Sequence, residues 1–234
     1  MKRIILLLSL AFTTVTFAQT SELNKTLQKH VSVNGIVNYK ALKADQTSLN
    51  KYITYAKTAP VKTWSAKKQK AFWMNVYNAY TLKVIIDHMP LKSITDIKEN
   101  NKDAWHLDIV EVGGKKYTLD QVENKILRVD FNDPRIHVGI NCASYSCPQL
   151  YNKAFTESNV ESTLEILTKK FVNDTKRNQI TSTTVKLSEI FNWFKGDFTK
   201  NGSLIQFLNK YSKTKIKADA KIEFLTYNWS LNNK

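Results

Sequence analysis

The stretch that decides the fold is Ala71-Phe-Trp-Met-Asn75-Val-Tyr-Asn78-Ala-Tyr-Thr-Leu-Lys-Val-Ile-Ile86, in a chain of 234 residues. Its apolar side chains recur at helical spacing and cover several sides of the helix, which is typical of a buried helix. Ser65 is the expected N-cap, and Pro90 ends the pattern. The sequence therefore predicts a long, central helix from Ala66 to His88.

Two asparagines interrupt the apolar surface of this helix. Asn75 and Asn78 are three positions apart and face the same way. A buried amide without a partner costs about 1–3 kcal/mol, so both side chains are expected to be hydrogen-bonded. Their partner is either a ligand, a catalytic imidazole or the backbone of a neighbouring loop.

The rest of the chain favours helices over strands. A hairpin is expected at residues 107–117 around Gly113-Gly114, and a Thr/Val-rich strand at 179–187. Further helices are predicted at residues 42–59, 119–128, 158–172, 189–195 and 203–211. These elements predict an α+β fold, a helix-rich single domain with a small, mainly antiparallel sheet.

The N-terminus has the pattern of an export signal. Met1-Lys2-Arg3 is basic, the run from Ile4 to Phe12 is apolar, and a small-residue cleavage site precedes Gln19. Residues 1–18 are therefore predicted to be a signal peptide and residues 19–234 the single domain. We expect an exported protein, periplasmic or secreted, without a stable membrane anchor. An oxidising compartment favours disulfides.

The charge is strongly basic but dispersed. Thirty-five basic and 20 acidic residues give a net charge of +15. Arginine is scarce, and no basic run is longer than two residues. Nucleic-acid-binding surfaces usually combine clustered arginine with aromatic side chains, so a solvated lysine surface is favoured and no nucleic-acid partner is expected.

Both cysteines and one of the four histidines lie in Asp133-Pro-Arg-Ile-His137-Val-Gly-Ile-Asn141-Cys142-Ala-Ser-Tyr-Ser-Cys147-Pro148. The β-branched run from Ile136 to Ile140 predicts a strand that ends in a polar loop. Alternation along a strand places His137 and Asn141 on one face and Cys142 on the other. Cys142 is therefore predicted to be a buried, inert thiol.

Cys147 has a different predicted environment. If Pro148 begins a helix, Cys147 is its N-cap, and the helix dipole lowers the pKa of the thiol. His137, ten residues earlier, is then a candidate general base. The alternative is structural: Cys142 and Cys147 form a disulfide, which four intervening residues allow, or remain two inert thiols.

Glu123 is the acidic residue of interest. It lies in the predicted 119–128 helix beside apolar Val122 and Ile126, where a carboxylate can hold a histidine ring. The alternative is an ordinary solvated glutamate. The sequence has no HExxH motif, no Cys/His cluster with metal-ligand spacing and no glycine-rich phosphate loop. Neither a metal nor a cofactor is therefore expected.

Six blocks of the sequence, in order, resemble the domain of unknown function 547 family, which occurs in bacteria and plants. The blocks cover nearly all of the predicted mature chain and are residues 35–39, 71–78, 119–128, 133–148, 187–198 and 227–232. Asn38 and Asn228 stand where the family commonly has aspartate, and Asn124 where it commonly has histidine. Any chemistry that needs those side chains is therefore in doubt for this chain.

The resemblance implies an exported bacterial member of a helix-rich family to which no activity is assigned. It also implies that His137, Cys142 and Cys147 belong to one site. The helix that carries Asn75 and Asn78 belongs to the same family pattern, and so do Glu123 and Asp197.

Two functions from different classes agree with these features. The first is a cysteine-dependent hydrolase or acyl transferase. Cys147 would attack a carbonyl, His137 would accept and return the proton, and Glu123 or Asn141 would orient the ring. In the same enzyme, the amide of Asn75 or Asn78 would donate to the oxyanion.

The second function is a non-catalytic envelope binding module for a glycan or peptide. Its Tyr- and Trp-rich surface would hold the ligand, and Cys142 and Cys147 would only brace the loop. The expected partner is thus a small molecule, a peptide or an envelope glycan. The geometry between His137 and Cys147 should separate the two hypotheses, because catalysis requires these side chains to be within reach of each other.

Overall fold

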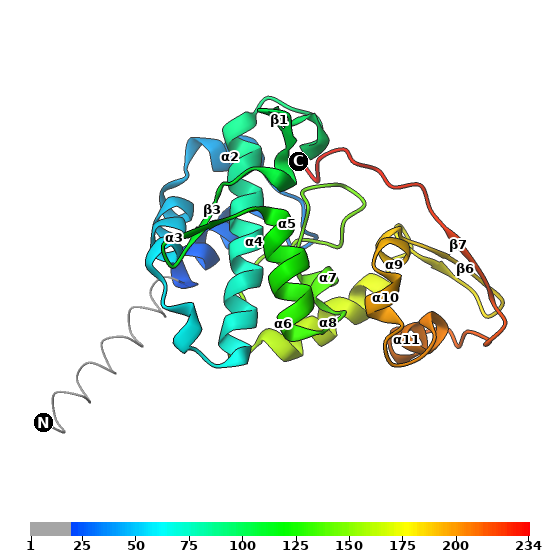
Figure 1. Cartoon of the computed structure of the whole chain (residues 1–234). Helices are drawn as coiled ribbons and strands as arrows, with labels where there is room; N and C mark the ends of the chain where they lie inside the picture. Colours follow the sequence, from blue (N-terminus) through cyan, green and yellow to red (C-terminus); the bar gives the residue numbers. More distant parts are fainter. Residues whose placement is uncertain (1–19) are drawn as a thin grey trace, which may run out of the picture.

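A computed structural model describes residues 20–234, and the predicted signal peptide at residues 1–18 lies outside the described residues. Helix α4 (Ala66–His88) lies at the centre of the α-helical part of the molecule (Figure 1). Its bounds are those predicted, and the Ser65 side chain accepts a hydrogen bond from the Lys68 backbone N–H. Nearly every side chain from Lys70 to Ile86 is buried. The prediction of a long, central helix is confirmed.

Other helices surround α4. Residues 20–30 are also helical. The remaining helices are α2 (Tyr39–Ala44), α3 (Thr47–Thr58), α5 (Leu119–Gln121), α6 (Arg128–Phe131), α7 (Ile136–Gly139), α8 (Val160–Val172), α9 (Ile190–Trp193), α10 (Lys195–Phe198) and α11 (Leu204–Tyr211). Short 3-10 helices are η1 (Val61–Thr63), η2 (Ile94–Asp96) and η3 (Ala104–His106), whereas η4 (Val122–Leu127) is a π-helix. Helices α2, α3, α8 and η4 contact α4 directly.

The strands are short and form three small sheets. Two are antiparallel hairpins, β1 (Lys98–Glu99) with β2 (Lys102–Asp103) and β3 (Val110–Val112) with β4 (Lys115–Tyr117). In the third sheet β6 (Thr184–Leu187) pairs antiparallel with β5 (Gln179–Ile180) and parallel with β7 (Lys221–Phe224). The fold is therefore α+β with small, mainly antiparallel sheets, as predicted.

The predicted strand from Ile136 to Ile140 is wrong, because this segment contains helix α7. The Asp133 carboxylate accepts a hydrogen bond from the Arg135 backbone N–H, and Pro134 follows Asp133 directly. An aspartate that accepts a hydrogen bond from the backbone N–H two residues later favours a turn, as does a following proline. Here that turn leads directly into α7, whose N-cap is Arg135. The alternation argument that placed Cys142 away from His137 therefore does not apply.

Tight packing also favours the helix. A Cβ atom at Gly139 would lie 2.0 Å from Met74 Cε and 2.9 Å from Leu164 Cδ2. Glycine thus lets α7 approach both α4 and α8 closely. This approach fixes the position of His137, two residues earlier in the same helical turn.

The helix predicted to begin at Pro148 is also absent, since residues 148–151 have no regular structure. Cys147 is therefore not a helix N-cap, and the helix dipole does not act on its thiol. Two smaller differences are breaks within predicted elements. The 42–59 helix is interrupted between α2 and α3, and the 179–187 strand is the β5–β6 hairpin.

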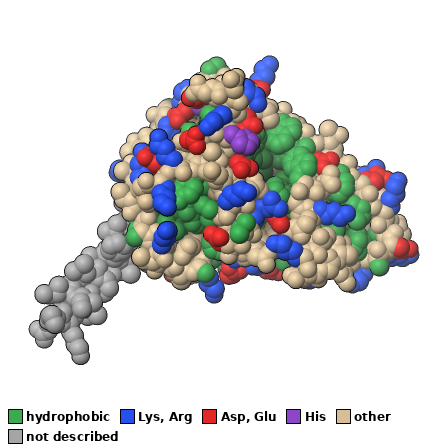
Figure 2. Space-filling view, viewed as in Figure 1, with side chains coloured by type: hydrophobic (Ala, Val, Ile, Leu, Met, Phe, Trp, Pro, Cys, Tyr) green, Lys and Arg blue, Asp and Glu red, His purple; other side chains and the backbone are tan. Residues whose placement is uncertain are grey.

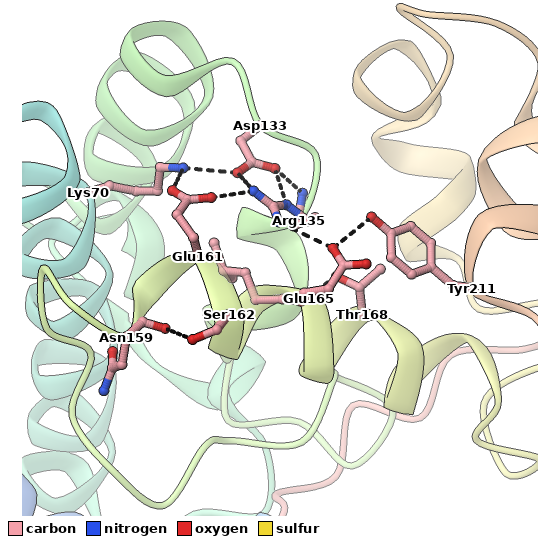
Figure 3. A network of polar contacts seen from close by, with 10 residues as sticks. Lys70, Asp133, Arg135, Asn159, Glu161, Ser162, Glu165, Thr168 and Tyr211 are labelled. Carbon is pink, nitrogen blue, oxygen red and sulfur yellow. Dashed lines mark hydrogen bonds and ion pairs between the residues drawn. The ribbon is translucent and has the colours of Figure 1, made fainter.

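An ion-pair network fastens α7 to the helices on either side (Figure 3). Lys70 Nζ on α4 lies 3.0 Å from Asp133 Oδ2 and 2.6 Å from Glu161 Oε1 on α8. Arg135 contacts the same two carboxylates, at 2.8 Å and 2.5 Å. The Tyr211 hydroxyl on α11 donates to Glu165 Oε2, which also pairs with Arg135. The residues just before His137 are thus tied to α4, α8 and α11.

Lysine and arginine side chains are spread over the face shown in Figure 2, among aspartate and glutamate. They do not gather into one basic stripe on this face. Within residues 20–234, none of the helices has both the length and the apolar character needed to span a bilayer.

Asn75 is 3% exposed, and both ends of its amide bind one residue of a neighbouring loop. Its Nδ2 donates to the Phe155 carbonyl at 2.8 Å, and its Oδ1 accepts from the Phe155 N–H at 2.9 Å. We expect Asn75→Ala to lower the free energy of unfolding by about 1–3 kcal/mol, because two buried backbone groups lose their partner. Urea unfolding would measure this. Asn50→Ala, at an exposed site on α3, is the control, and an equal, small effect of both would contradict the prediction.

Candidate functional site

A cavity of about 120 Å³ brings together the reactive side chains of the chain. Tyr77 from α4, Glu123 from η4 and His137 from α7 line it, together with both cysteines. The remaining lining residues are apolar or aromatic and are Trp105, Ile140, Ile190, Trp193, Phe194, Tyr227 and Trp229. Segments distant in the sequence therefore meet at one small site, as the resemblance implied for His137, Cys142 and Cys147.

The two cysteines are free and adjacent. Their Sγ atoms lie 2.9 Å apart, and the backbone N–H of Cys142 donates to Cys147 Sγ at 3.1 Å. Cys142 is partly exposed, whereas Cys147 is buried. Cys142 Sγ also lies 3.1 Å from Ser144 Oγ and 3.2 Å from the Tyr227 hydroxyl. Cys142 is thus the sulfur with the greater number of side-chain hydrogen-bond partners.

These contacts give the two thiols opposite acidities. Hydrogen bonds with the Cys147 thiol and with the Ser144 and Tyr227 hydroxyls outweigh burial and lower the pKa of Cys142. Burial, together with the neighbouring Cys142 sulfur, raises the pKa of Cys147 well above its usual value. Thiolates are the nucleophilic form of cysteine. The sequence argument favoured Cys147 as the nucleophile, but the geometry favours Cys142.

His137 is held by a carboxylate and a guanidinium. Its Nε2 lies 2.8 Å from Asp197 Oδ2 of α10. Arg128 donates to the same carboxylate from Nε at 2.6 Å and from Nη2 at 3.2 Å. The ring also stacks on Phe194, with centroids 3.9 Å apart. Because Asp197 is bonded on both sides, it fixes the orientation of the imidazole.

The other ring nitrogen of His137 has a free lone pair. Burial lowers the pKa of His137, so the ring is neutral and donates from Nε2 to Asp197. Its Nδ1 is buried without a hydrogen-bond partner among the described residues and lies 3.8 Å from Glu123 Oε1. A buried nitrogen without a partner beside a cavity is a candidate general base.

Glu123 is a carboxylate that gains a proton near neutral pH. Burial raises its pKa to about 7, although the Tyr77 hydroxyl donates to its Oε2 at 2.9 Å and opposes the shift. Glu123 lies on η4, a π-helical segment inside the continuous helix from α5 to α6. Such segments are rare and occur often at functional sites. Because the Glu123 side chain is only 12% exposed, the alternative of a solvated glutamate is wrong.

Aromatic side chains form one wall of the cavity. Trp193 and Trp229 are stacked, with ring centroids 5.6 Å apart, and Tyr227 contacts both rings. Trp105 meets Trp229 edge to face. Trp193 is 46% exposed, so this wall reaches the surface. It offers a flat, apolar face to whatever enters the cavity.

The loop that carries the cysteines is braced from several sides. The Arg177 side chain donates to the carbonyls of Cys147 and Tyr145, both at 2.7 Å. The C-terminal segment runs alongside the loop, where Ser144 forms an isolated antiparallel bridge with Leu231. These contacts hold the sulfur atoms in place without a disulfide.

The three asparagines predicted to bind substrate do not line this cavity. Asn75 binds Phe155, and Asn78 binds the Gly139 carbonyl and the Asn141 N–H. Asn141 donates to the Pro148 carbonyl and accepts from the Ala143 N–H. The prediction that Asn75 and Asn78 are buried and hydrogen-bonded is confirmed. Both amides form hydrogen bonds with backbone groups of neighbouring segments.

Catalysis by Cys147 would require His137 to lie within reach of its sulfur. Both sulfurs and the His137 ring line the same cavity, but among the described residues no hydrogen bond joins the ring to either sulfur. The predicted convergence of His137, Cys147 and the central helix is confirmed, with Tyr77 as the residue of α4 that lines the cavity. Within residues 20–234, no group of three or more His, Cys, Asp or Glu side chains is placed to hold a metal ion.

Reasoning from the residues did not single out several residues of the site. Arg128, Ser144 and Tyr77 carried no motif of their own that pointed to a site. Asp197 was reached only through the family resemblance. A usable signal existed for the aromatic wall, because Tyr227 and Trp229 lie close together in the polar C-terminal segment.

The family model described as protein of unknown function, DUF547, matches residues 61–172. The matched segment contains Tyr77, Glu123, His137 and both cysteines, and so supports the resemblance for that half of the site. Asp197 and the tryptophans of the C-terminal part lie outside it. No curated protein and no solved structure matches the chain significantly.

Proposed function

We propose that the protein is a cysteine-dependent hydrolase or acyl transferase in which Cys142, rather than Cys147, is the nucleophile. The observation that carries the proposal is the environment of Cys142 Sγ. Three S–H or O–H groups, from Cys147, Ser144 and Tyr227, lie within 3.2 Å of it in a cavity shared with His137 and Glu123. Such donors stabilise a thiolate that is ready to attack.

The remaining groups have roles in this reaction. The Cys142 thiolate attacks the carbonyl carbon of an acyl group, and protonated Glu123 gives a proton to the leaving group. Nδ1 of His137 then accepts a proton from the water or alcohol that releases the acyl group, and Asp197 stabilises the resulting imidazolium. A cavity of about 120 Å³ favours a small acyl group.

The proposal is tested with 4-nitrophenyl acetate, a generic activated ester, and the reduced full chain. We expect an acetyl adduct on Cys142, detected by peptide mass spectrometry, and a burst of nitrophenolate. Cys142→Ser should remove the burst, whereas Cys147→Ser should keep it. His137→Gln, which can still donate to Asp197, should slow release of the acetyl group. An adduct confined to lysines, or an unchanged burst in Cys142→Ser, would overturn the proposal.

Thiol alkylation tests the assignment of the nucleophile separately. At pH 7 iodoacetamide should modify Cys142 at least roughly tenfold faster than Cys147, because one unit of pKa changes the thiolate fraction about tenfold. The rate at Cys142 should fall as the pH is lowered, with the thiolate fraction. Equal rates at the two sulfurs in the native protein would contradict the assignment.

The aromatic wall favours a second candidate function, an envelope binding module for a glycan or peptide in which the cysteines are structural. Stacked Trp193 and Trp229 present a flat apolar surface of the kind that holds sugar rings or peptide side chains. Intrinsic tryptophan fluorescence in the presence of peptidoglycan fragments tests it. Binding that is lost in Trp193→Ala but kept in Cys142→Ser, together with no acyl adduct in wild type, would favour this function.

A further inference from the structure

The geometry points to a second activity of the same loop: Cys142 and Cys147 are an attacking and a resolving thiol that exchange with small disulfides. The inference goes beyond acyl transfer and does not require it, because acyl transfer has no use for Cys147 as a nucleophile. The Sγ atoms lie 2.9 Å apart, against about 2.05 Å in a disulfide. A shift of less than one ångström therefore closes the bond.

The two sulfurs differ in access in the way that this activity needs. Cys142 is partly exposed and lines the cavity, so a disulfide from solution can reach it. Cys147 is 4% exposed and contacts Cys142 directly. It is therefore placed to react with a mixed disulfide formed on Cys142 and not with a disulfide in solution. The pKa shifts agree, since the pKa is lowered at the accessible sulfur and raised at the buried one.

The backbone around the pair is arranged to hold it. Asn141 spans the loop, with its Oδ1 accepting from the Ala143 N–H and its Nδ2 donating to the Pro148 carbonyl. Ala143, between the cysteines, has φ +61°, a left-handed conformation that a residue other than glycine rarely adopts. The turn thus returns the chain so that the backbone N–H of Cys142 donates to Cys147 Sγ, an interaction that strengthens when Cys147 is a thiolate.

The exchange balances with a disulfide RSSR as the oxidant. The Cys142 thiolate attacks one sulfur of RSSR, forming a mixed disulfide and releasing RS⁻. Cys147 then loses its proton and attacks Cys142 Sγ, which forms the Cys142–Cys147 bond and releases the second RS⁻, and the proton from Cys147 leaves on one of the two released thiols. The dithiol loses two electrons and RSSR gains them. Glu123, in the same cavity, is the nearby carboxylate whose pKa of about 7 suits transfer of the Cys147 proton.

Oxidised glutathione and the reduced full chain test the inference. Samples quenched with acid at successive times should show a glutathione adduct on Cys142 first and the internal disulfide afterwards, with no lasting adduct. In Cys147→Ser the adduct should persist on Cys142. In Cys142→Ser the adduct on Cys147 should form at least roughly tenfold more slowly than that on Cys142, because the remaining thiol is buried.

Each other outcome has a definite meaning. A lasting adduct in wild type would overturn the role of Cys147 as the resolving thiol. No reaction with oxidised glutathione, in a protein whose Cys142 is modified by iodoacetamide and acetylated by the ester, would overturn the exchange activity and leave the proposed acyl transfer intact. Cys147→Ala is a second variant in case Cys147→Ser does not fold. The order of adduct and internal disulfide in wild type tests the inference without any variant.

Discussion

Replacing Asp197 with alanine is expected to lower the free energy of unfolding by about 3 kcal/mol at pH 7, because it leaves a partly buried arginine and a buried histidine without their shared partner. Arg128 makes two hydrogen bonds to this carboxylate and His137 makes one. The Asp197 side chain is only 13% exposed, so water cannot replace it fully. Urea unfolding of the reduced protein would measure the loss.

The loss of unfolding free energy in Asp197→Ala should become smaller as the pH is lowered. Hydrogen bonds from His137 and Arg128 hold the pKa of Asp197 well below its usual value. The carboxylate therefore binds fewer protons in the folded than in the unfolded state. Its contribution is complete above about pH 4, the pKa of an unfolded aspartate, and is lost progressively at lower pH.

Wild type and Asp197→Ala should thus differ less at pH 3 than at pH 7. Asp130→Ala, at an exposed site on α6, is the control and should change stability little at either pH. A difference between wild type and Asp197→Ala that stays the same from pH 7 to pH 3 would show that the ion pair is not its source.

The fold was predictable where one signal dominated. The α4 helix has a serine cap, an apolar interior and a proline after its end, and all three agree. The capping box of Thr118 with Gln121 likewise begins α5 at Leu119, where a helix was predicted. The α7 segment was different, because the β-branched run from Ile136 predicted a strand, whereas Asp133 and Pro134 form a turn that leads into a helix. Contacts of Gly139 with α4 and α8, which the sequence does not show, stabilise the helix.

The sequence predicted which residues meet at the candidate site. It did not predict which sulfur is the more acidic or what orients His137. His137, Glu123 and both cysteines do line one cavity. Which sulfur is the more acidic depends on a hydroxyl 85 residues away, at Tyr227, and the orientation of His137 depends on Asp197, 60 residues away. Sequence spacing carries no information on such contacts. The π-helical turn that places Glu123 beside His137 also has no simple sequence signal.

The buried Glu123 side chain leads to a prediction of the opposite sign to that for Asp197. Burial raises its pKa to about 7, so the folded state binds a proton that the unfolded state has already released. Ionisation of this carboxyl therefore costs stability as the pH rises from about 4.5 through 7. The shift corresponds to about 3 kcal/mol above pH 7.

Glu123→Gln removes this cost, because an amide stays neutral and its oxygen still accepts from the Tyr77 hydroxyl. Compared with wild type, the variant should have nearly the same free energy of unfolding at pH 5 and be more stable at pH 8, by up to about 3 kcal/mol. Urea unfolding between these pH values, under reducing conditions, measures the difference. The matched carboxylate-to-amide control is exposed Asp130→Asn, which should show no such rise. If the difference in free energy of unfolding between Glu123→Gln and wild type is the same from pH 5 to pH 8, the buried carboxyl does not titrate near neutral pH. It then cannot be the proton donor of the proposed reaction.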